Sequence, residues 1–213
     1  MALENELLHL RGMVLKMCEQ ILENLKISIE VYHKWDLKKA ELINDDVVDL
    51  YERLIEESCL NIMLKERPYA SDLREVSGIL KLVSDLERLG DHAEDLEEFA
   101  SKLKDVKHYP VKYLEDAISK AMDMVDKSVL AFVNKDIELA NKVIKDDDTV
   151  DELYDSCIKE LINGTKNNEY PSDFAIYTTL VVKYIERIAD HAVNVAEWVV
   201  YIQSGFRKDK QIF

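Results

Sequence analysis

Hydrophobic residues recur along most of the chain at intervals of three and four positions. In the clearest stretch, Leu82, Leu86, Leu89, Ala93 and Leu96 would lie on one face of a helix. Only 5 Gly and 3 Pro interrupt the 213 residues, which favours long helices over the short strands and frequent turns of a sheet. The pattern predicts six helices, at 4–34, 37–66, 70–104, 111–134, 137–166 and 172–205.

Two of the predicted helices carry nearly the same sequence. Residues 86–93 read LERLGDHA, and residues 185–192, which lie 99 positions later, read IERIADHA. Glu98 falls on Glu197 at the same offset. A repeat of this length indicates two copies of one structural unit. We therefore expect an all-α fold of two repeated three-helix bundles with pseudo-twofold symmetry, one over residues 1–107 and the other over 108–213.

The chain is acidic, with 43 Asp and Glu against 28 Lys and Arg and a net charge of -15. Such a surface repels nucleic-acid backbones and no basic patch offsets it, so we expect no DNA or RNA partner. No run of 18 apolar residues would span a membrane, and the N-terminus does not resemble a secretory signal. Cys18, Cys59 and Cys157 are too scattered for a metal or disulfide motif. We expect a cytoplasmic protein with reduced, buried cysteines.

Acidic residues are ordered along four of the predicted helices. Each stripe contains one pair of carboxylates four residues apart, and these pairs are Asp45/Asp49, Glu87/Asp91, Asp147/Asp151 and Glu186/Asp190. Like charges at this spacing cost about 0.2–0.5 kcal/mol per pair on an exposed helix. Four pairs in a repeated chain suggest a compensating cation, and an all-oxygen set suits magnesium, calcium, manganese or iron better than zinc or copper. The alternative is a solvated acidic face balanced by arginines and lysines.

Histidine gives less support for a metal site. His92 and His191 lie about 100° around their helices from the neighbouring aspartates, on the side of Arg88 and Arg187. We expect these histidine and arginine side chains to form hydrogen-bonded contacts with a neighbouring helix or with the other half of the molecule.

Motifs for catalysis are missing from the sequence. Glu30 and His33 have the Glu-x-x-His spacing that di-iron bundles use in pairs, but no second copy occurs. The chain also has no glycine-rich phosphate loop and no nucleophile elbow. These observations favour a binding protein over an enzyme.

Residues 186–197, ERIADHAVNVAE, closely resemble the signature helix of the PhoU family, and residues 67–74 and 87–93 are similar to the matching part of the first PhoU repeat. The resemblance covers nearly the whole chain. It implies a metal-binding, non-enzymatic negative regulator of phosphate uptake and phosphate-responsive signalling. In this family paired Glu/Asp-x-x-x-Asp motifs hold iron or zinc ions, and by position these motifs fall on the four pairs named above. Manganese and magnesium are the other candidate cofactors. The implied partners are the ATPase subunit of a phosphate ABC transporter and a sensor histidine kinase, and a homodimer is the candidate assembly.

Two positions depart from the family pattern. Asp95 stands where the signature has Asn, as Asn194 does in the second half, so the first site is expected to be more acidic. The spacing from Asp45 to Tyr51 is one residue shorter than that from Asp147 to Tyr154, which weakens the assignment of the Asp45/Asp49 pair. Two other functions stay open, a carboxylate-bridged di-metal enzyme and an accessory protein of an ion-driven phosphate carrier.

Overall fold

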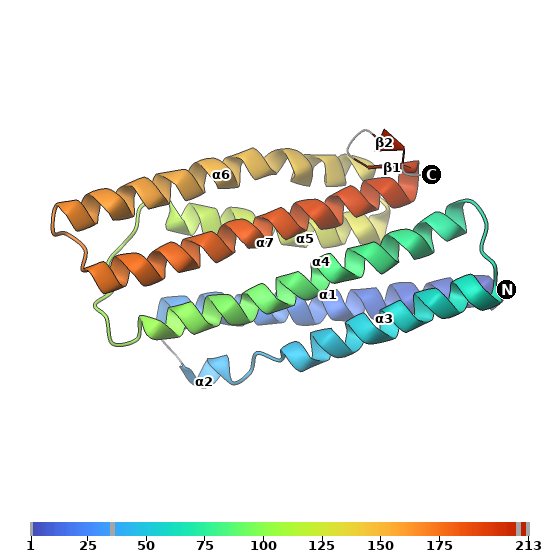
Figure 1. The fold of residues 1–213 in the computed structure, drawn as a ribbon, viewed down its shortest axis with the longest axis horizontal. Coiled ribbons are helices and arrows are strands. Elements are labelled where there is room, and N and C mark those ends of the chain that lie inside the picture. The colour runs from blue at the N-terminus through green and yellow to red at the C-terminus, as the bar shows by residue number, and fades with distance from the viewer. Residues whose placement is uncertain (1, 35–36, 208–209, 212–213) are drawn as a thin grey trace.

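The computed structural model describes residues 2–34, 37–207 and 210–211, most of which lie in six long helices (Figure 1). In chain order the elements are α1 (Ala2–Lys34), α2 (Leu37–Ala40), α3 (Asp45–Lys65), α4 (Ser71–Lys102), α5 (Leu114–Asn134), α6 (Ile137–Lys166), α7 (Ser172–Ser204), β1 (Phe206–Arg207) and β2 (Lys210–Gln211). The fold is all-α, as predicted, apart from the antiparallel pairing of β1 with β2. No helix within the described ranges is long and apolar enough to cross a membrane.

The connection between α5 and α6 shows how local sequence ends one helix and begins the next. Lys135 adopts a left-handed conformation with φ 55°, and its backbone N–H closes the last turn of α5. Asp136 then caps α6, because its side chain accepts a hydrogen bond of 2.9 Å from the backbone N–H of Leu139. Two long helices therefore follow each other with only these two residues between them.

The prediction of one helix over 37–66 is wrong, because the chain leaves the helix after Ala40 and α3 begins at Asp45. Asn44 lies outside the helix, with φ -135° and ψ 86°, and its N–H donates to the side-chain oxygen of Asn24 on α1 at 3.2 Å. Asp45 and Asp46 then occupy the first turn of α3, where the helix dipole favours negative charge. The corresponding segment of the second half, α6, is uninterrupted.

The start of the fourth predicted helix also differs, at Leu114 instead of residue 111. Tyr113 is left-handed with φ 73°, so it cannot form part of a regular helix. Pro110, near the middle of the chain, lies in the connection before it.

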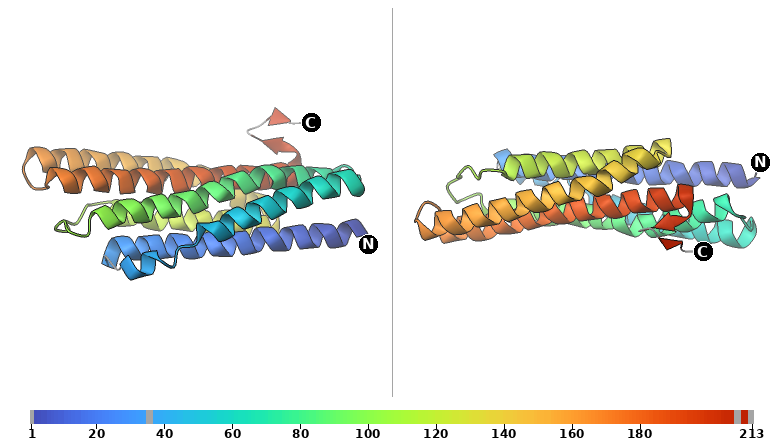
Figure 2. Two further views of the ribbon diagram at one scale, coloured as in Figure 1. Left: turned by 60° about the horizontal axis from the view of Figure 1, so that its bottom comes forward. Right: turned by 90° about the horizontal axis from the view of Figure 1, so that it is seen from above.

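The helices form two groups that meet along α4 and α7. α1, α3 and α4 pack together in the first half, and α5, α6 and α7 pack together in the second. α4 and α7 lie side by side and antiparallel at the centre, with the other helices around them (Figures 1 and 2). Each half is thus a three-helix bundle, and the two share one extensive contact.

The core repeats from one half to the other in a fixed register. On α4 and α7, residues 99 positions apart are buried together, including Leu86 with Ile185 and Leu89 with Ile188. On α3 and α6 the offset is 102, as in the buried pair Val48 and Val150. All three cysteines are buried and free, as the sequence predicted. In this register Asp45 corresponds to Asp147, and Asp49 corresponds to Asp151. The unequal spacing from these aspartates to Tyr51 and Tyr154 therefore does not weaken the assignment of the Asp45/Asp49 pair.

Leu89→Ala should lower the free energy of unfolding by about 2–5 kcal/mol, because Leu89 is 0% exposed and its loss leaves a cavity between helices. Leu64→Ala, at a position that is 76% exposed, should change stability by no more than about 0.5 kcal/mol. Urea denaturation of both variants measures this difference. Equal effects at the two sites would contradict the core assignment.

Candidate metal centres

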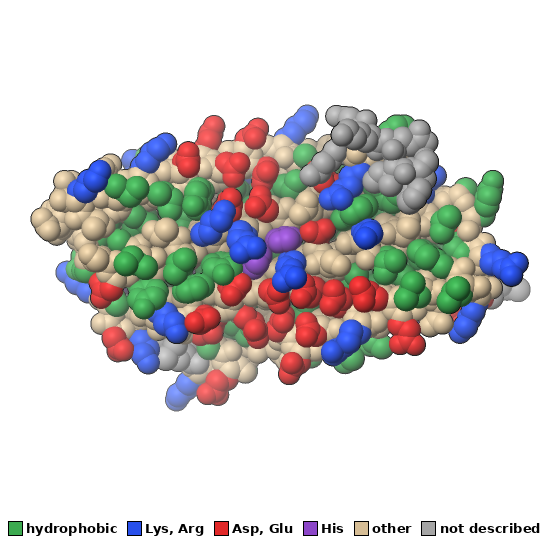
Figure 3. Space-filling view, in the orientation of Figure 1, with side chains coloured by type: hydrophobic (Ala, Val, Ile, Leu, Met, Phe, Trp, Pro, Cys, Tyr) green, Lys and Arg blue, Asp and Glu red, His purple; other side chains and the backbone are tan. Residues whose placement is uncertain are grey.

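The first group of carboxylates lies where α3 faces α4. Asp45, Asp49 and Glu52 come from α3, and Glu87 and Asp91 come from the middle of α4. One oxygen from each of Asp49, Glu52 and Glu87 lies within 4.8 Å of the other two. Figure 3 shows acidic side chains crowded over these two helices. We call these five residues, together with Glu94, the first cluster.

Asp45 occupies the most enclosed position of the first cluster. Its Oδ1 atom is shut off from water and has no hydrogen-bond partner among the residues that the structure describes. A Cβ on Gly90 of α4 would lie 2.5 Å from this oxygen, so the two helices approach this closely only because residue 90 is glycine. Burial, and then the charges of Glu94, Asp91, Asp49 and Glu87, raise the pKa of Asp45 to about 7. The fold therefore holds an acid where its ionised form is unfavourable.

Other carboxylates of the first cluster also lie where their ionised forms are unfavourable. Burial raises the pKa of Glu52, Glu87 and Glu94, and neighbouring carboxylates add to each shift. Arg88 is the cation that contacts them, at 2.7 Å from Asp91 and 3.4 Å from Glu87. One guanidinium cannot neutralise six carboxylates, so the cluster has the charge and the ligand atoms to hold a divalent cation.

The second cluster consists of Asp147 and Asp151 on α6 and Glu186 and Asp190 on α7. Oδ1 of Asp147 is buried without a hydrogen-bond partner, as in Asp45. Burial, and then the charges of Asp190, Asp151, Asp148 and Glu186, raise the pKa of Asp147 to about 6. The pKa of Asp190 is also raised, mainly by burial. The structure thus brings the eight residues selected from the sequence together as two groups of four.

The two clusters differ at three corresponding positions. Glu52 and Glu94 of the first cluster are replaced by Tyr154 and Val193 in the second, which removes two carboxylates. Ser84 is replaced by Lys183, whose ammonium group bonds to Glu186 and lies 5.3 Å from the centre of the Tyr154 ring. The second cluster therefore has two fewer carboxylates and a lysine bonded to one of its members, whereas the first has six carboxylates with Arg88 beside them.

Glu52 was not among the ligands predicted from the sequence, although its oxygen completes the close group with Asp49 and Glu87. Its position three residues after Asp49, in the same acidic stripe, is the signal that could have identified it. The comparison with the second half hides this signal, because Tyr154 occupies the corresponding position.

The histidines meet between the two clusters, as Figure 3 shows at the centre of the face. The His92 and His191 ring centres are 5.2 Å apart, so each ring contacts the other half. The hydrogen bond predicted to another helix is found for His191 but not for His92, whose Nδ1 lies 3.3 Å from Asp95 on its own helix. Nδ1 of His191 lies 3.0 Å from Asp85 of α4, and Trp198 Nε1 donates to the same carboxylate at 3.1 Å. Asp85 thus links α4 to α7, and nothing in the sequence identified it, because its counterpart is Tyr184.

The same prediction is wrong for the arginines. Arg88 bonds to acids on its own helix, and Arg187 lies over Tyr184, also on its own helix, at 5.8 Å from the ring centre. The Glu30 and His33 pair does not form a site either. Glu30 bonds to Lys39, and His33 lies 3.6 Å from Glu115 on α5.

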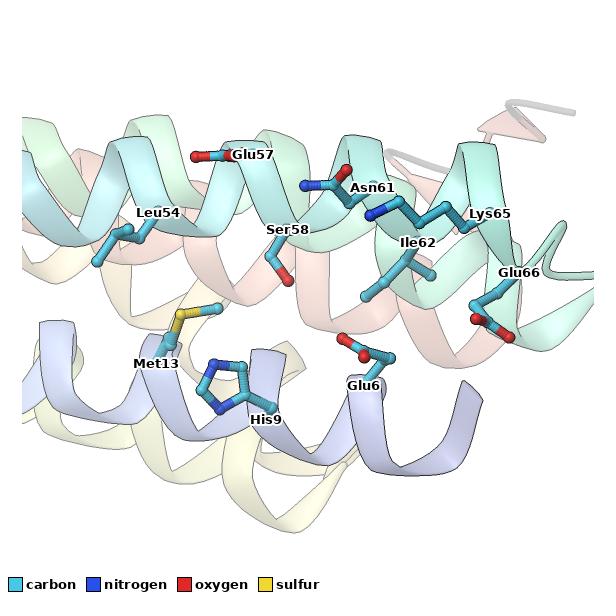
Figure 4. Close-up of a pocket in the computed structure, with 10 residues that line it drawn as sticks. All are labelled: Glu6, His9, Met13, Leu54, Glu57, Ser58, Asn61, Ile62, Lys65 and Glu66. Carbon is cyan, nitrogen blue, oxygen red and sulfur yellow. The ribbon is translucent and has the colours of Figure 1, made fainter. Parts of the chain in front are cut away.

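A separate pocket of about 260 Å³ lies between the N-terminal part of α1 and the C-terminal part of α3. His9 and Met13 of α1 and Ser58 and Ile62 of α3 point into the space between the two helices (Figure 4). Within the ranges that the structure describes, the one close group of three metal-ligating side chains is in the first cluster. The geometry therefore gives no support for a metal in this pocket.

The family model described as the PhoU domain matches the chain twice, at residues 14–100 and 114–199. The chain belongs to the PhoU family. It is 37% identical over 211 residues to a protein of Aquifex aeolicus called "Phosphate-specific transport system accessory protein PhoU homolog", covering 96% of this chain and 94% of the relative. A protein of Clostridium acetobutylicum with the same description is 32% identical over 210 residues, covering 97% and 96% of the two chains.

Solved structures of the PhoU family have the same fold. The crystal structure of PhoU from Pseudomonas aeruginosa has a TM-score of 0.90 at 31% identity and covers 95% of this chain and 99% of its own. The phosphate transport system regulatory protein PhoU from Streptococcus pneumoniae has a TM-score of 0.89 at 26% identity, with coverage of 98% and 100%. The family resemblance noted in the sequence is confirmed, including its two repeats.

The stability of the metal-free protein should fall as pH rises from about 4 to about 7. Over this range folded Asp45 keeps a proton that the unfolded chain, with a pKa of 3.8, has released, so raising the pH favours unfolding. Other acids of the two clusters have pKa values shifted in the same direction. Asp45→Asn should raise the free energy of unfolding at pH 8 by about 1–2 kcal/mol, since solvent screens a half-exposed carboxyl, and change it little at pH 4.

Chemical denaturation in chelator at the two pH values measures this effect. Asp126→Asn, at an exposed position on α5, is the control. A wild-type protein that gains stability between pH 4 and 7, or an Asp45→Asn variant that loses it at pH 8, would contradict the strain assigned to this carboxyl.

Proposed function

We propose that this chain is a metal-binding negative regulator of phosphate uptake and phosphate-responsive signalling. It acts in the cytoplasm without catalysing a reaction, by contact with the ATPase subunit of a phosphate transporter and with a sensor histidine kinase. Membership of the PhoU family supports the regulatory role, because relatives are described as accessory or regulatory proteins of phosphate transport. A homodimer is the proposed assembly.

The donor atoms support the proposed metal binding. Oδ1 of Asp45 and Oδ1 of Asp147 are buried without partners, and each lies among carboxylates that raise its pKa. A divalent cation would give both oxygens a partner and remove the repulsion between neighbours. Asp45, Asp49, Glu87 and Asp91, with Glu52, would hold metal in the first cluster, and Asp147, Asp151, Glu186 and Asp190 would hold it in the second. Iron, manganese, magnesium and zinc are the candidates.

A bound cation would supply charge neutralisation and cross-link two helices in each half. Its ligands come from α3 and α4 in the first cluster and from α6 and α7 in the second. Both clusters flank the central contact between α4 and α7, so metal would stiffen the face that they share. We propose that a partner protein binds this face, and that bound metal holds the face rigid for that contact.

Metal content is the first test of this function. Untagged protein prepared without chelator should contain stoichiometric metal by plasma mass spectrometry. A folded variant with Glu87→Gln, Asp91→Asn, Glu186→Gln and Asp190→Asn should contain none. The same two proteins, cross-linked in phosphate-replete cells, should differ in capture of the transporter ATPase. Absence of metal from the wild type after incubation with iron, manganese and zinc would refute metal binding, and capture of an ion-driven carrier alone would refute the proposed partner.

The two clusters should bind metal unequally because the second has two fewer carboxylates and because Lys183 bonds to Glu186, one of its proposed ligands. Lys183→Ser gives the second cluster the residue of the first, and it should raise Mn²⁺ affinity at the weaker site by about tenfold. The reciprocal Ser84→Lys should weaken the stronger site by a similar factor. Isothermal titration calorimetry measures both, with exposed Lys159→Ser as the control. Identical isotherms for wild type and Lys183→Ser would contradict the role of this lysine.

A further inference from the structure

A cavity of about 430 Å³ lies at one end of the molecule, away from both carboxylate clusters. It is enclosed by the end of α3, the beginning of α4, the end of α7 and the start of β1, which meet at this end of the bundle (Figure 1). Its lining residues are Met63, Ala70, Leu73, Arg74, Ser77, Tyr201, Ser204, Gly205 and Phe206. Cavities that bind small molecules enclose on the order of 300–1,000 Å³, so this one is large enough for a ligand.

Arg74 is the charged residue of the cavity, and its guanidinium has no partner within the described residues. Its Nε atom is shut off from water and donates no hydrogen bond. Its side-chain stem lies against Gly205, where an added Cβ would be 3.6 Å from Arg74 Cδ. By contrast, Arg11 is paired with Glu75, and Arg207 with Glu197 at 3.0 Å. A donor that has lost water without gaining an acceptor destabilises the protein unless a ligand supplies the acceptor.

The remaining polar groups of the cavity are used within the protein. The Ser77 hydroxyl donates to the backbone oxygen of Arg74 at 3.1 Å and lies 3.4 Å from the Tyr201 hydroxyl. The Ser204 hydroxyl donates to the backbone oxygen of Val200 at 2.8 Å. Arg74 therefore offers the one unsatisfied donor among these lining side chains, which selects a ligand with a single acidic head group.

The walls of the cavity favour a ligand with an apolar body. Met63, Leu73 and Phe206 are apolar, and Leu73 and Phe206 remain 44% and 48% exposed. Inorganic phosphate alone would satisfy Arg74 but would leave these walls in water. Glu75, the next residue on α4, does not repel an anion strongly, because it is bonded to Arg11 and lies 3.8 Å from Lys135.

We propose that this cavity, the Arg74 pocket, binds an amphiphilic anion. The ligand is a small molecule with an apolar body and one carboxylate or phosphate group that pairs with the Arg74 guanidinium. The second half of the chain provides an internal comparison. A groove of about 590 Å³ lies at the corresponding ends of α6 and α7, but Asp173 occupies the position equivalent to Arg74. The second groove therefore lacks a guanidinium, and its charged lining residue, Lys166, is exposed.

Calorimetric titration of the full chain with octanoate and octyl phosphate tests the proposal, with neutral octanol and inorganic phosphate as comparison probes. Each amphiphilic anion should bind with one site per chain, and octanol and inorganic phosphate should bind at least about tenfold more weakly. Arg74→Gln should lose affinity for the anions by a similar factor, and Arg74→Lys should lose less. Arg53→Gln, which removes an exposed arginine from α3, should bind as the wild type does.

The location of the ligand is read from the wild-type protein, so it does not depend on the folding of a variant. With methyl-labelled methionine, the Met63 resonance should shift on addition of octanoate. The proposal is overturned if neither anion binds, if octanol binds as tightly, if folded Arg74→Gln retains wild-type affinity, or if the Met63 resonance stays unchanged at saturation.

Discussion

The contact between α4 and α7 is the constraint on which the rest of the molecule depends. Each of these helices packs against both other helices of its own bundle and against the other. Their buried residues, such as Leu86 with Ile185 and Leu89 with Ile188, follow one register. Because the apolar faces are committed to this core, the acidic faces of the same helices are turned towards α3 and α6. Burial of the apolar residues on each helix therefore keeps the carboxylates of the same helix close to one another.

Repulsion within the clusters is tolerated because a larger apolar core outweighs it. Gly90 illustrates the balance, since it allows α3 and α4 to approach until Asp45 loses its water and hydrogen-bond partners. Active and binding sites commonly store strain of this kind. The second half reaches a different balance, in which Lys183 offsets part of the charge inside the protein.

Periodicity and the internal repeat predicted most of the fold, because the helical faces and the 99-residue offset can be read from the sequence without knowing which distant segments are in contact. They also selected the eight carboxylates that the structure groups together. Features that depend on contacts between distant segments could not be predicted in this way. The break before Asp45 depends on Asn24 of α1, and the roles of Asp85 and Arg74 depend on α7. Glu52 was missed because its counterpart is Tyr154.

The two register offsets, 102 for α3 with α6 and 99 for α4 with α7, mean that the hairpin of the first half is three residues longer than that of the second. Residues 66–70 and 167–171 form connections of the same length, so the extra residues lengthen the end of α3 by one residue and the start of α4 by two. The three extra residues lie beside the Arg74 pocket, so the two halves differ in length at the end of the molecule that carries this cavity and keep one spacing at the centre that carries the carboxylates.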